Sequence, residues 1–379
     1  MSAPRFVATC ARGLEAVVAA ELAALGLETA ATEVGGVPFA ADERGAVRAC
    51  WRLRAASRVL LRLAAFPAPD DQALYRTMRA LAESYAYTPL SPGALLHPDR
   101  SFAIAATSSR SALTDTRWIA LKAKDAIADG QRARHGRRAD VDRERPDLAL
   151  RIRLHDDRAT LLLDLVGEAL DHRGYRVETT AAPVREQLAA AALLASGWDG
   201  RGPVVDPMCG SGTFLAEAGA IARGLAPNRL RVSWAFTGLP GFEGLLDEVR
   251  REPIPAPDPD ARLFGNDLEP SAAAAARRNL DAAGLGDATS ISVGDAFDFE
   301  PPPGPGLVTV NPPYGERIAE SAEQWKRLGD LLKRRYAGWK AVVLAGDPSR
   351  GKQLGLRPSR RIPVWNGPLE ARVLVVDLW

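Results

Sequence analysis

The sequence predicts an α/β protein whose C-terminal part is a doubly wound sheet and whose N-terminal part is a smaller α+β region. From residue 183 onward, short apolar segments and helical segments alternate regularly, with glycine turns between them. The apolar segments are nearly uninterrupted, which is typical of parallel strands covered on both faces. Before residue 180, strand-like and helical patterns follow each other less regularly.

Length and composition limit the class of protein. A chain of 379 residues with 46% hydrophobic content can form two or three domains. No apolar run reaches the roughly 20 residues of a membrane span, and the first residues lack the pattern of a signal peptide, so we expect a cytoplasmic protein with no membrane contact. The cysteines Cys10, Cys50 and Cys209 are too scattered for a disulfide framework or a metal site.

The first 96 residues predict mixed structure. Residues 6–28 fit a strand, a turn and a helix ended by glycine, and residues 35–53 fit β-like segments around turn residues. Residues 56–66 predict a second helix, stopped by proline, and residues 70–96 look helical and then irregular. Together these segments predict a small α+β unit followed by a second one.

The next segments predict a strand over residues 101–110, a helix over 111–134 with Thr114 or Asp115 as its cap, and two strands over 148–167. In the first strand of that pair, leucine and isoleucine alternate with arginine. This period of two predicts a strand with one buried face and one basic, solvated face.

Basic residues are concentrated in this region. Residues 100–158 hold 14 Arg and Lys against 9 Asp and Glu, and residues 131–138 contain four arginines. Such a local excess can attract a polyanion such as a nucleic acid. The alternative is that arginine is simply abundant throughout, with 43 Arg against 6 Lys, which reflects genome composition.

The C-terminal part predicts a helix over residues 184–198 and then repeated strand and helix units. These units lie at residues 202–225 and 262–285, and further strands are predicted within 291–299, 307–318, 339–347 and 371–379. Ligands in such folds bind beyond the carboxyl ends of the strands, so the residues after each strand are the first candidates for a site.

The first strand ends at Asp206, and a glycine-rich turn from Cys209 to Gly212 leads into a helix that begins near Thr213. Glycines let the backbone approach a ligand, and a helix N-terminus favours an anionic group. No lysine follows the second glycine, so the turn is not a P-loop. A nucleophilic role for Cys209 is the weaker alternative to a small side chain that fits the turn.

Later strands end in similar residues. Asp267 follows the second strand, where an acidic side chain can accept from both hydroxyls of a ribose, and Asp295 follows the third, where it can accept from an adenine amino group. The fourth ends in Asn311, two prolines and Tyr314. Each ending alone has a simpler reading, since an aspartate after a strand often only caps a helix. Four in order favour a nucleoside cofactor with a charged tail.

The motifs DPMCGSGT, FGNDLEP, GDAF and NPPYGER resemble those of class I S-adenosylmethionine-dependent methyltransferases that modify exocyclic amino groups. HRGYR, LAPNR and WNGPLEAR resemble one family of these, the THUMP-domain guanine-N2 RNA methyltransferases that act on bacterial large-subunit ribosomal RNA or on tRNA. The resemblance implies a ferredoxin-like unit at residues 1–68, a THUMP RNA-binding domain at 69–165 and a Rossmann-like methyltransferase domain at 166–379.

The resemblance also implies roles for individual residues. Asn311 and the Pro312 carbonyl accept from the target amino group, Pro313 helps to fix that carbonyl, and Tyr314 stacks on the base. S-adenosylmethionine is the implied cofactor, and no metal is expected. The residues implied to hold the cofactor are Asp206, Met208, Cys209, Gly210, Gly212, Thr213, Asp267, Leu268, Asp295 and Ala296.

The expected function is methylation of a guanine amino group in RNA, most readily 23S rRNA, with tRNA second, and with RNA bound by the basic THUMP region. The alternatives are an amino methyltransferase acting on adenine or on a protein glutamine, and a non-catalytic RNA-binding assembly protein. Larger rRNA members of the family carry a second methyltransferase module, so one reaction is expected here. The sequence leaves open the nucleotide, the number of methyl groups added and the oligomeric state.

Overall fold

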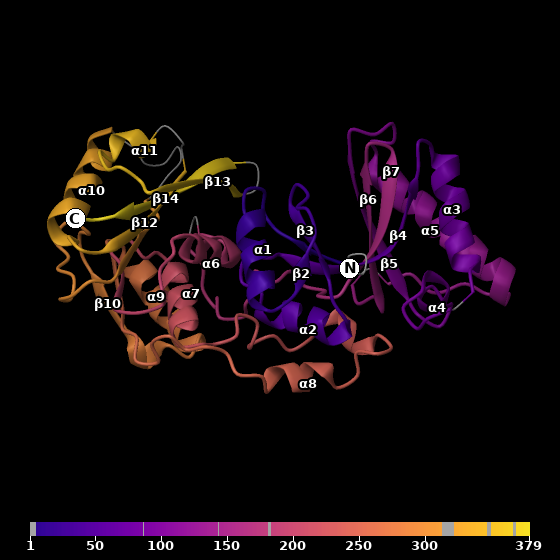
Figure 1. Cartoon of the computed structure of the whole chain (residues 1–379), viewed down its shortest axis with the longest axis horizontal. Helices are drawn as coiled ribbons and strands as arrows, with labels where there is room; N and C mark the ends of the chain where they lie inside the picture. Colours follow the sequence, from indigo (N-terminus) through magenta and orange to yellow (C-terminus); the bar gives the residue numbers. More distant parts are fainter. Residues whose placement is uncertain are drawn as a thin grey trace.

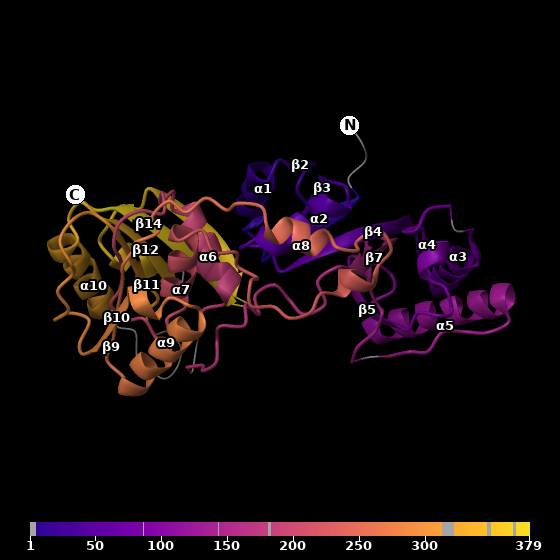
Figure 2. The ribbon, with the colours of Figure 1, turned by 90° about the horizontal axis from the view of Figure 1, so that it is seen from below.

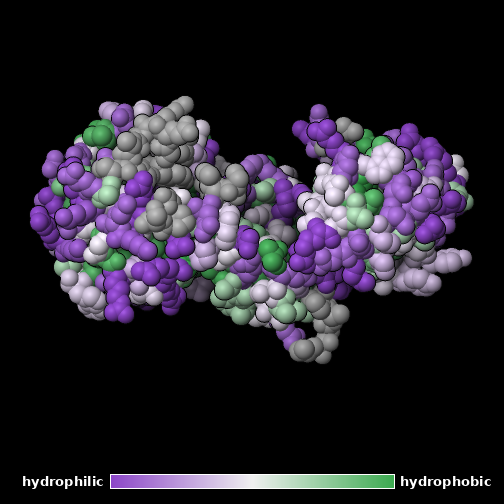
Figure 3. Space-filling model, turned by 90° about the horizontal axis from the view of Figure 1, so that it is seen from above, coloured by the Kyte–Doolittle hydropathy of each residue, from purple (hydrophilic) through white to green (hydrophobic). Residues whose placement is uncertain are grey.

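The computed structural model forms an elongated molecule built on two β-sheets, one toward each end (Figure 1). It describes residues 5–85, 87–142, 144–180, 183–312, 322–346, 350–366 and 369–379. Within these ranges each sheet has seven strands, and no helix is both long and apolar enough to cross a bilayer. Hydrophilic residues cover much of both ends in the surface view (Figure 3).

The N-terminal sheet has the strand order β2-β3-β1-β4-β7-β6-β5. Its strands are β1 (Phe6–Thr9), β2 (Glu28–Thr29), β3 (Gly36–Ala40), β4 (Arg58–Pro67), β5 (Phe102–Ser109), β6 (Leu148–His155) and β7 (Arg158–Asp164). The helices of this half are α1 (Glu15–Ala24), α2 (Glu43–Arg52), α3 (Asp71–Glu83), α4 (Pro92–Leu95) and α5 (Thr116–His135). Asp115 caps α5 by accepting from Arg117 N and Trp118 N, as one of the two predicted caps.

Two predicted elements are wrong. Residues 35–53 contain the helix α2 as well as β3, because Asp42 caps the helix by accepting from Gly45 N and because Ala46, Val47, Ala49 and Cys50 bury one of its sides. The helix predicted over residues 56–66 is instead the strand β4, which spans Arg58–Pro67. The run pairs with β1 on one side and β7 on the other, so its place in the middle of the sheet overrides the helix propensity of leucine and alanine.

Because β4 pairs with both neighbours, one sheet runs through the regions expected to be the ferredoxin-like unit and the THUMP domain. The predicted β6–β7 hairpin is confirmed, with Asp156 and Asp157 at φ 49° and 55° in its turn. The predicted alternation in β6 is also confirmed: its leucines and isoleucine are buried, and Arg151 and Arg153 lie on the other face.

The C-terminal sheet has the order β10-β9-β8-β11-β12-β14-β13. Its strands are β8 (Val204–Asp206), β9 (Leu263–Asp267), β10 (Thr289–Val293), β11 (Leu307–Val310), β12 (Lys340–Ala345), β13 (Arg360–Asn366) and β14 (Leu369–Asp377). The α-helices are α6 (Glu186–Ala195), α7 (Thr213–Ala222), α8 (Leu245–Arg250), α9 (Pro270–Ala282), α10 (Ala322–Arg335) and α11 (Arg350–Gln353). The expected parallel sheet is correct for β10 to β12, whereas β14 is antiparallel to both of its neighbours and β13 was not predicted.

Contacts between α2 and α8 join the two halves, and these helices lie side by side in Figures 1 and 2. Glu252, just after α8, accepts from Arg48 at 2.8 Å and forms ion pairs with Arg44 and Arg52. A hydrogen bond from Arg48 lowers the pKa of the Glu252 carboxyl. This cluster attaches the N-terminal half to the methyltransferase-like half on the side of α8.

Candidate active site

The carboxyl ends of β8, β9, β10 and β11 meet at one edge of the C-terminal sheet, because these strands are adjacent and parallel. Backbone hydrogen bonds tie the ends together: Cys209 N donates to Asn266 O at 2.9 Å, and Gly294 N donates to Asp267 O at 3.0 Å. The structure therefore brings the four predicted strand endings into one place.

The turn after β8 needs its glycines. Gly210 and Gly212 have φ of 54° and 81°, a left-handed backbone that favours glycine, and a Cβ on Gly212 would lie 3.3 Å from Ala276 in α9. Gly212 precedes Thr213, the first residue of α7. The turn thus places the N-terminus of α7 at the sheet edge, where its free N–H groups can donate hydrogen bonds to an anionic group.

Cys209 is buried in this turn, and burial raises the pKa of its thiol well above the ordinary value. A protonated thiol is a poor nucleophile. Its neighbour Met208 is half-buried. The structure therefore favours the small-side-chain reading of Cys209 over the nucleophile reading.

Asp206 is almost fully buried at the end of β8. Burial raises the pKa of its carboxyl to about 7, although the Met208 N–H donates to it, and the nearby Asp267 charge adds to the rise. Because burial disfavours the charged form of this carboxyl, a cationic partner would stabilise that form. A charged amino group of a ligand is such a partner.

We expect this burial to make stability depend on pH. The pKa of Asp206 is higher in the folded protein than its ordinary value of 3.8, so the folded state binds the proton more tightly. Without cofactor, the free energy of unfolding should therefore fall as pH rises from about 4 to about 7, by roughly 1.4 kcal/mol per unit of pKa difference. Denaturation at several pH values should therefore show a steeper fall over this range in the wild type than in Asp206→Asn.

Asp295→Asn, the same substitution at an exposed position of the same sheet edge, is the matched control. Parallel pH profiles for the wild type and Asp206→Asn would contradict the prediction.

Asp267 is half-buried at the end of β9. Its carboxylate accepts from Gly210 N at 2.8 Å and from Glu269 N at 3.0 Å, so it also fixes the glycine turn. Leu268 beside it is 66% exposed, an unusual position for leucine that offers an apolar surface next to this carboxylate. Asp295 is exposed and accepts from Phe297 N, and Ala296 is buried.

Asn311 follows β11 directly. Its Oδ1 is buried and has no hydrogen-bond partner within the described part of the chain. A buried acceptor without a donor costs free energy unless a ligand supplies that donor. Pro312 is buried next to it, whereas Pro313 and Tyr314 lie outside the described residues.

Two residues that support the site were not assigned from the sequence. Arg176, half-buried before α6, donates to Ser211 Oγ at 3.1 Å and to Thr213 Oγ1 at 3.0 Å. Asn279 in α9 is buried and donates to Ser211 O at 2.9 Å. Arg176 belongs to the HRGYR motif, so the sequence contained a signal that could have pointed to it. Nothing in the pattern around Asn279 indicated its hydrogen bond to Ser211.

The other charged residues of HRGYR differ in their surroundings. His172 is exposed, and its ring forms a hydrogen bond with the Glu168 carboxylate. Arg173 is only 1% exposed: it donates to Leu170 O and to Arg54 O and pairs with Glu217 in α7. Arg173 is therefore a buried residue that joins the two halves of the molecule.

Models of three known domain families match the chain. The model described as RMKL-like, methyltransferase domain, matches residues 173–374, that of the RlmL ferredoxin-like domain matches residues 5–60, and that of the THUMP domain matches residues 70–164. The first of these covers more than half of the chain.

Curated relatives include the ribosomal RNA large subunit methyltransferases K/L of Pseudomonas syringae pv. tomato, 38% identical, and of Pseudomonas aeruginosa, 37% identical. Each match covers 98% of this chain but only 50% and 52% of the relative. The chain thus spans about half the length of these relatives.

Solved structures agree in fold over the whole chain. SMU.472, a candidate methyltransferase crystallised with S-adenosylhomocysteine, is 29% identical with a TM-score of 0.86, over 100% of this chain and 99% of its own. A predicted N6-adenine-specific DNA methylase from Listeria monocytogenes is 28% identical with a TM-score of 0.82, over 100% and 97%.

S-adenosylmethionine is the cofactor of this class of enzyme, and the site residues fit it. The buried Asp206 carboxyl suits the cationic end of its methionine tail, the N-terminus of α7 suits the tail's carboxylate, and Asp267 suits a ribose. With this site on a matching fold, the chain belongs to the RMKL-like methyltransferase domain family.

Proposed function

We propose that this protein methylates the exocyclic amino group of a guanine in RNA, giving N2-methylguanosine. The most suitable substrate is 23S rRNA, with tRNA second. The observation that carries the proposal is the buried Oδ1 of Asn311, which has no hydrogen-bond partner among the residues that the structure describes and lies at the sheet edge beside the residues expected to hold the cofactor. Such an acceptor can position the target amino group, because that group can donate one of its N–H bonds to it.

The chemistry requires a poor nucleophile to be held in line, because the lone pair of a guanine amino group is delocalised into the ring. The bound cofactor supplies an activated methyl group. Asn311 Oδ1 and the Pro312 carbonyl accept from the two N–H bonds and favour the positive charge that develops on nitrogen. The two consecutive prolines fix that carbonyl, since each proline locks its own φ and Pro313 restricts Pro312. Tyr314 stacks on the base, worth about 1–3 kcal/mol.

RNA as the substrate is supported by the THUMP match over residues 70–164, by the Pseudomonas relatives, which are named as ribosomal RNA methyltransferases, and by the basic balance of residues 100–158. We keep the division into units at residues 1–68, 69–165 and 166–379 as part of this proposal. The first two units hold the RNA and the third carries out the transfer.

A second candidate is supported by the Listeria monocytogenes structure, which is described as a predicted N6-adenine-specific DNA methylase. The amino group of adenine needs the same two acceptors. The two candidates therefore share the roles of Asn311 and Pro312 and differ in the nucleic acid and the base.

Nucleoside mass spectrometry tests the proposal. Large-subunit rRNA and tRNA from cells lacking this gene, and genomic DNA as the comparison, are each incubated with the protein and S-adenosylmethionine and then digested. We expect N2-methylguanosine to increase in one RNA pool, rRNA first, and no N6-methyladenine to form in DNA.

N6-methyladenine in DNA with unchanged RNA would overturn the proposal in favour of the second candidate. If the protein binds S-adenosylhomocysteine but adds no methyl group to the rRNA pool, that result would count against rRNA as the substrate. Asn311→Ala in the same assay is the negative control.

A further inference from the structure

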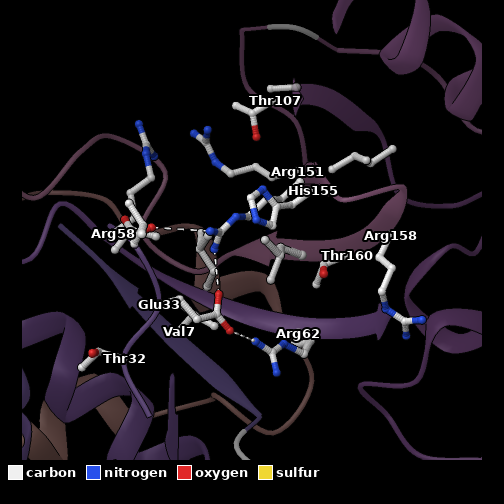
Figure 4. A pocket seen from close by; sticks show the side chains of 17 residues that line it. Val7, Thr32, Glu33, Arg58, Arg62, Thr107, Arg151, His155, Arg158 and Thr160 are labelled. Carbon is white, nitrogen blue, oxygen red and sulfur yellow. Dashed lines mark hydrogen bonds and ion pairs between the residues drawn. The ribbon is translucent and has the colours of Figure 1, made fainter. Parts of the chain in front are cut away.

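The uncovered face of the N-terminal sheet carries a groove lined by arginines. The groove has a volume of about 650 Å³ and crosses β1, β4, β7, β6 and β5. Figure 4 shows the side chains that line it. Its five arginines are Arg58, Arg62, Arg151, Arg153 and Arg158.

These arginines come from two separate parts of the chain. Arg58 and Arg62 lie on β4, outside the segment matched as a THUMP domain, and the others lie on the β6–β7 hairpin inside it. The pairing of β4 with β7 brings them to one face. The sequence region with the densest arginines contributes none of them.

Three of the four arginines in that dense run, residues 131–138, make contacts within their own unit. Arg132 pairs with Asp129, and Arg137 pairs with Asp99. Arg134 donates to Glu83 O at 2.7 Å. Arg132 and Arg137 each have a carboxylate partner of their own, which leaves their charges less available to a polyanion.

The arginines of the groove are only partly neutralised. Glu33 pairs with Arg62 at 3.2 Å and with Arg153 at 2.7 Å, as Figure 4 shows for Glu33 and Arg62. Asp164, whose side chain is fully buried, pairs with Arg58 and Arg151. Two carboxylates thus face five arginines.

Arg158 is exposed, and its side chain has no hydrogen bond or ion pair within the described ranges. Figure 4 shows it extending away from the other arginines. The groove therefore keeps a positive excess, which an anionic ligand can match.

We propose that this groove binds the sugar-phosphate backbone of the RNA substrate. Guanidinium groups match phosphate oxygens in a fork, and the hydroxyls of Thr107 and Thr160 add further donors. Apart from His155, no lining residue has an aromatic ring, so the groove has no platform for stacking bases. The groove therefore contacts the backbone and contributes affinity and position, not sequence recognition.

The position of the groove suits a substrate that reaches the active site. Figure 1 shows α3 and α5 on the side of β4, β7 and β6 that faces away from the C-terminal half. The opposite face, which holds the groove, is turned toward the rest of the molecule. We therefore place the RNA strand in the groove with its target base directed toward the C-terminal half.

The inference rests on the proposed RNA substrate and is tested by binding of the full chain to a labelled single-stranded uridine RNA and to large-subunit rRNA. The groove variant is Arg153→Ala/Arg158→Ala, and its matched control is Arg132→Ala/Arg137→Ala, which removes the same charge from the same region. We expect the groove variant to weaken RNA binding about tenfold and to reduce the salt slope of log K by about 0.7 for each lost phosphate contact. The control should change affinity less than about twofold.

A second variant tests the sign of the effect. Glu33→Gln frees Arg62 and Arg153 from their carboxylate, so RNA affinity should rise by about twofold or more. S-adenosylhomocysteine binding should be unchanged in all three variants, which shows that the C-terminal half is folded.

Equal losses in the groove and control variants, or no loss in the groove variant, would overturn the inference while leaving RNA methylation in place. Methylation of DNA and not of RNA by the wild type would instead remove the proposed function. The two failures are therefore distinguishable.

Discussion

Replacing Asn311 by alanine is expected to lower the rate of methyl transfer about 10²–10³-fold, the usual cost of removing one positioned hydrogen-bonding group that stabilises charge in the transition state. The reason is the buried Oδ1 of Asn311, which has no partner in the described part of the chain. Alanine removes this acceptor at the site of reaction. Transfer of labelled methyl groups to large-subunit rRNA measures the loss.

Binding of S-adenosylhomocysteine separates catalysis from folding. We expect its affinity to stay within about twofold in Asn311→Ala, since the residues predicted to hold the cofactor follow other strands. Asn311→Asp keeps an acceptor oxygen and should retain more activity than the alanine variant. Full activity in Asn311→Ala would refute the role of this amide and, with it, the observation that carries the proposed function.

Local patterns predicted the C-terminal half well because each of its central strands is buried on both faces and therefore nearly all apolar. The same criterion misread β4. Its sequence is rich in leucine and alanine, and its place in the sheet is set by pairing with β1, about fifty positions before it, and with β7, about a hundred positions after it. β13 carries two arginines and a proline at the edge of the sheet, which hides the pattern of a strand.

The candidate site was predictable where one residue follows one strand, as for Asp206, Asp267 and Asn311. Its supports were not, because they depend on contacts across the fold. Asn279 reaches Ser211 from the middle of α9, and Arg173 is buried against Arg54 from the other half. The arginine groove is a similar case, since its residues are brought together only by the sheet.

Replacing Asp267 by alanine is expected to weaken cofactor binding about a hundredfold or more. A carboxylate that accepts from both ribose hydroxyls makes two charge-assisted hydrogen bonds, each worth roughly 1.5–3 kcal/mol. Asp267 also accepts from Gly210 N at 2.8 Å, so its loss loosens the glycine turn before α7. Calorimetric titration with S-adenosylhomocysteine measures the change, and Glu269→Gln, an exposed acid two residues on, is the matched control.

The direct and the indirect role of Asp267 can be separated with a second ligand, the 2′-deoxy analogue of S-adenosylhomocysteine. If the carboxylate contacts the ribose, the wild type should bind the analogue more weakly than the parent compound, and Asp267→Ala should bind the two almost equally. The pair forms a cycle in which only a direct contact gives a coupling between protein and ligand changes. A variant that still discriminated between the two ligands as strongly as the wild type would show that Asp267 acts only by holding Gly210, and the ribose would then be held by another residue of this sheet edge.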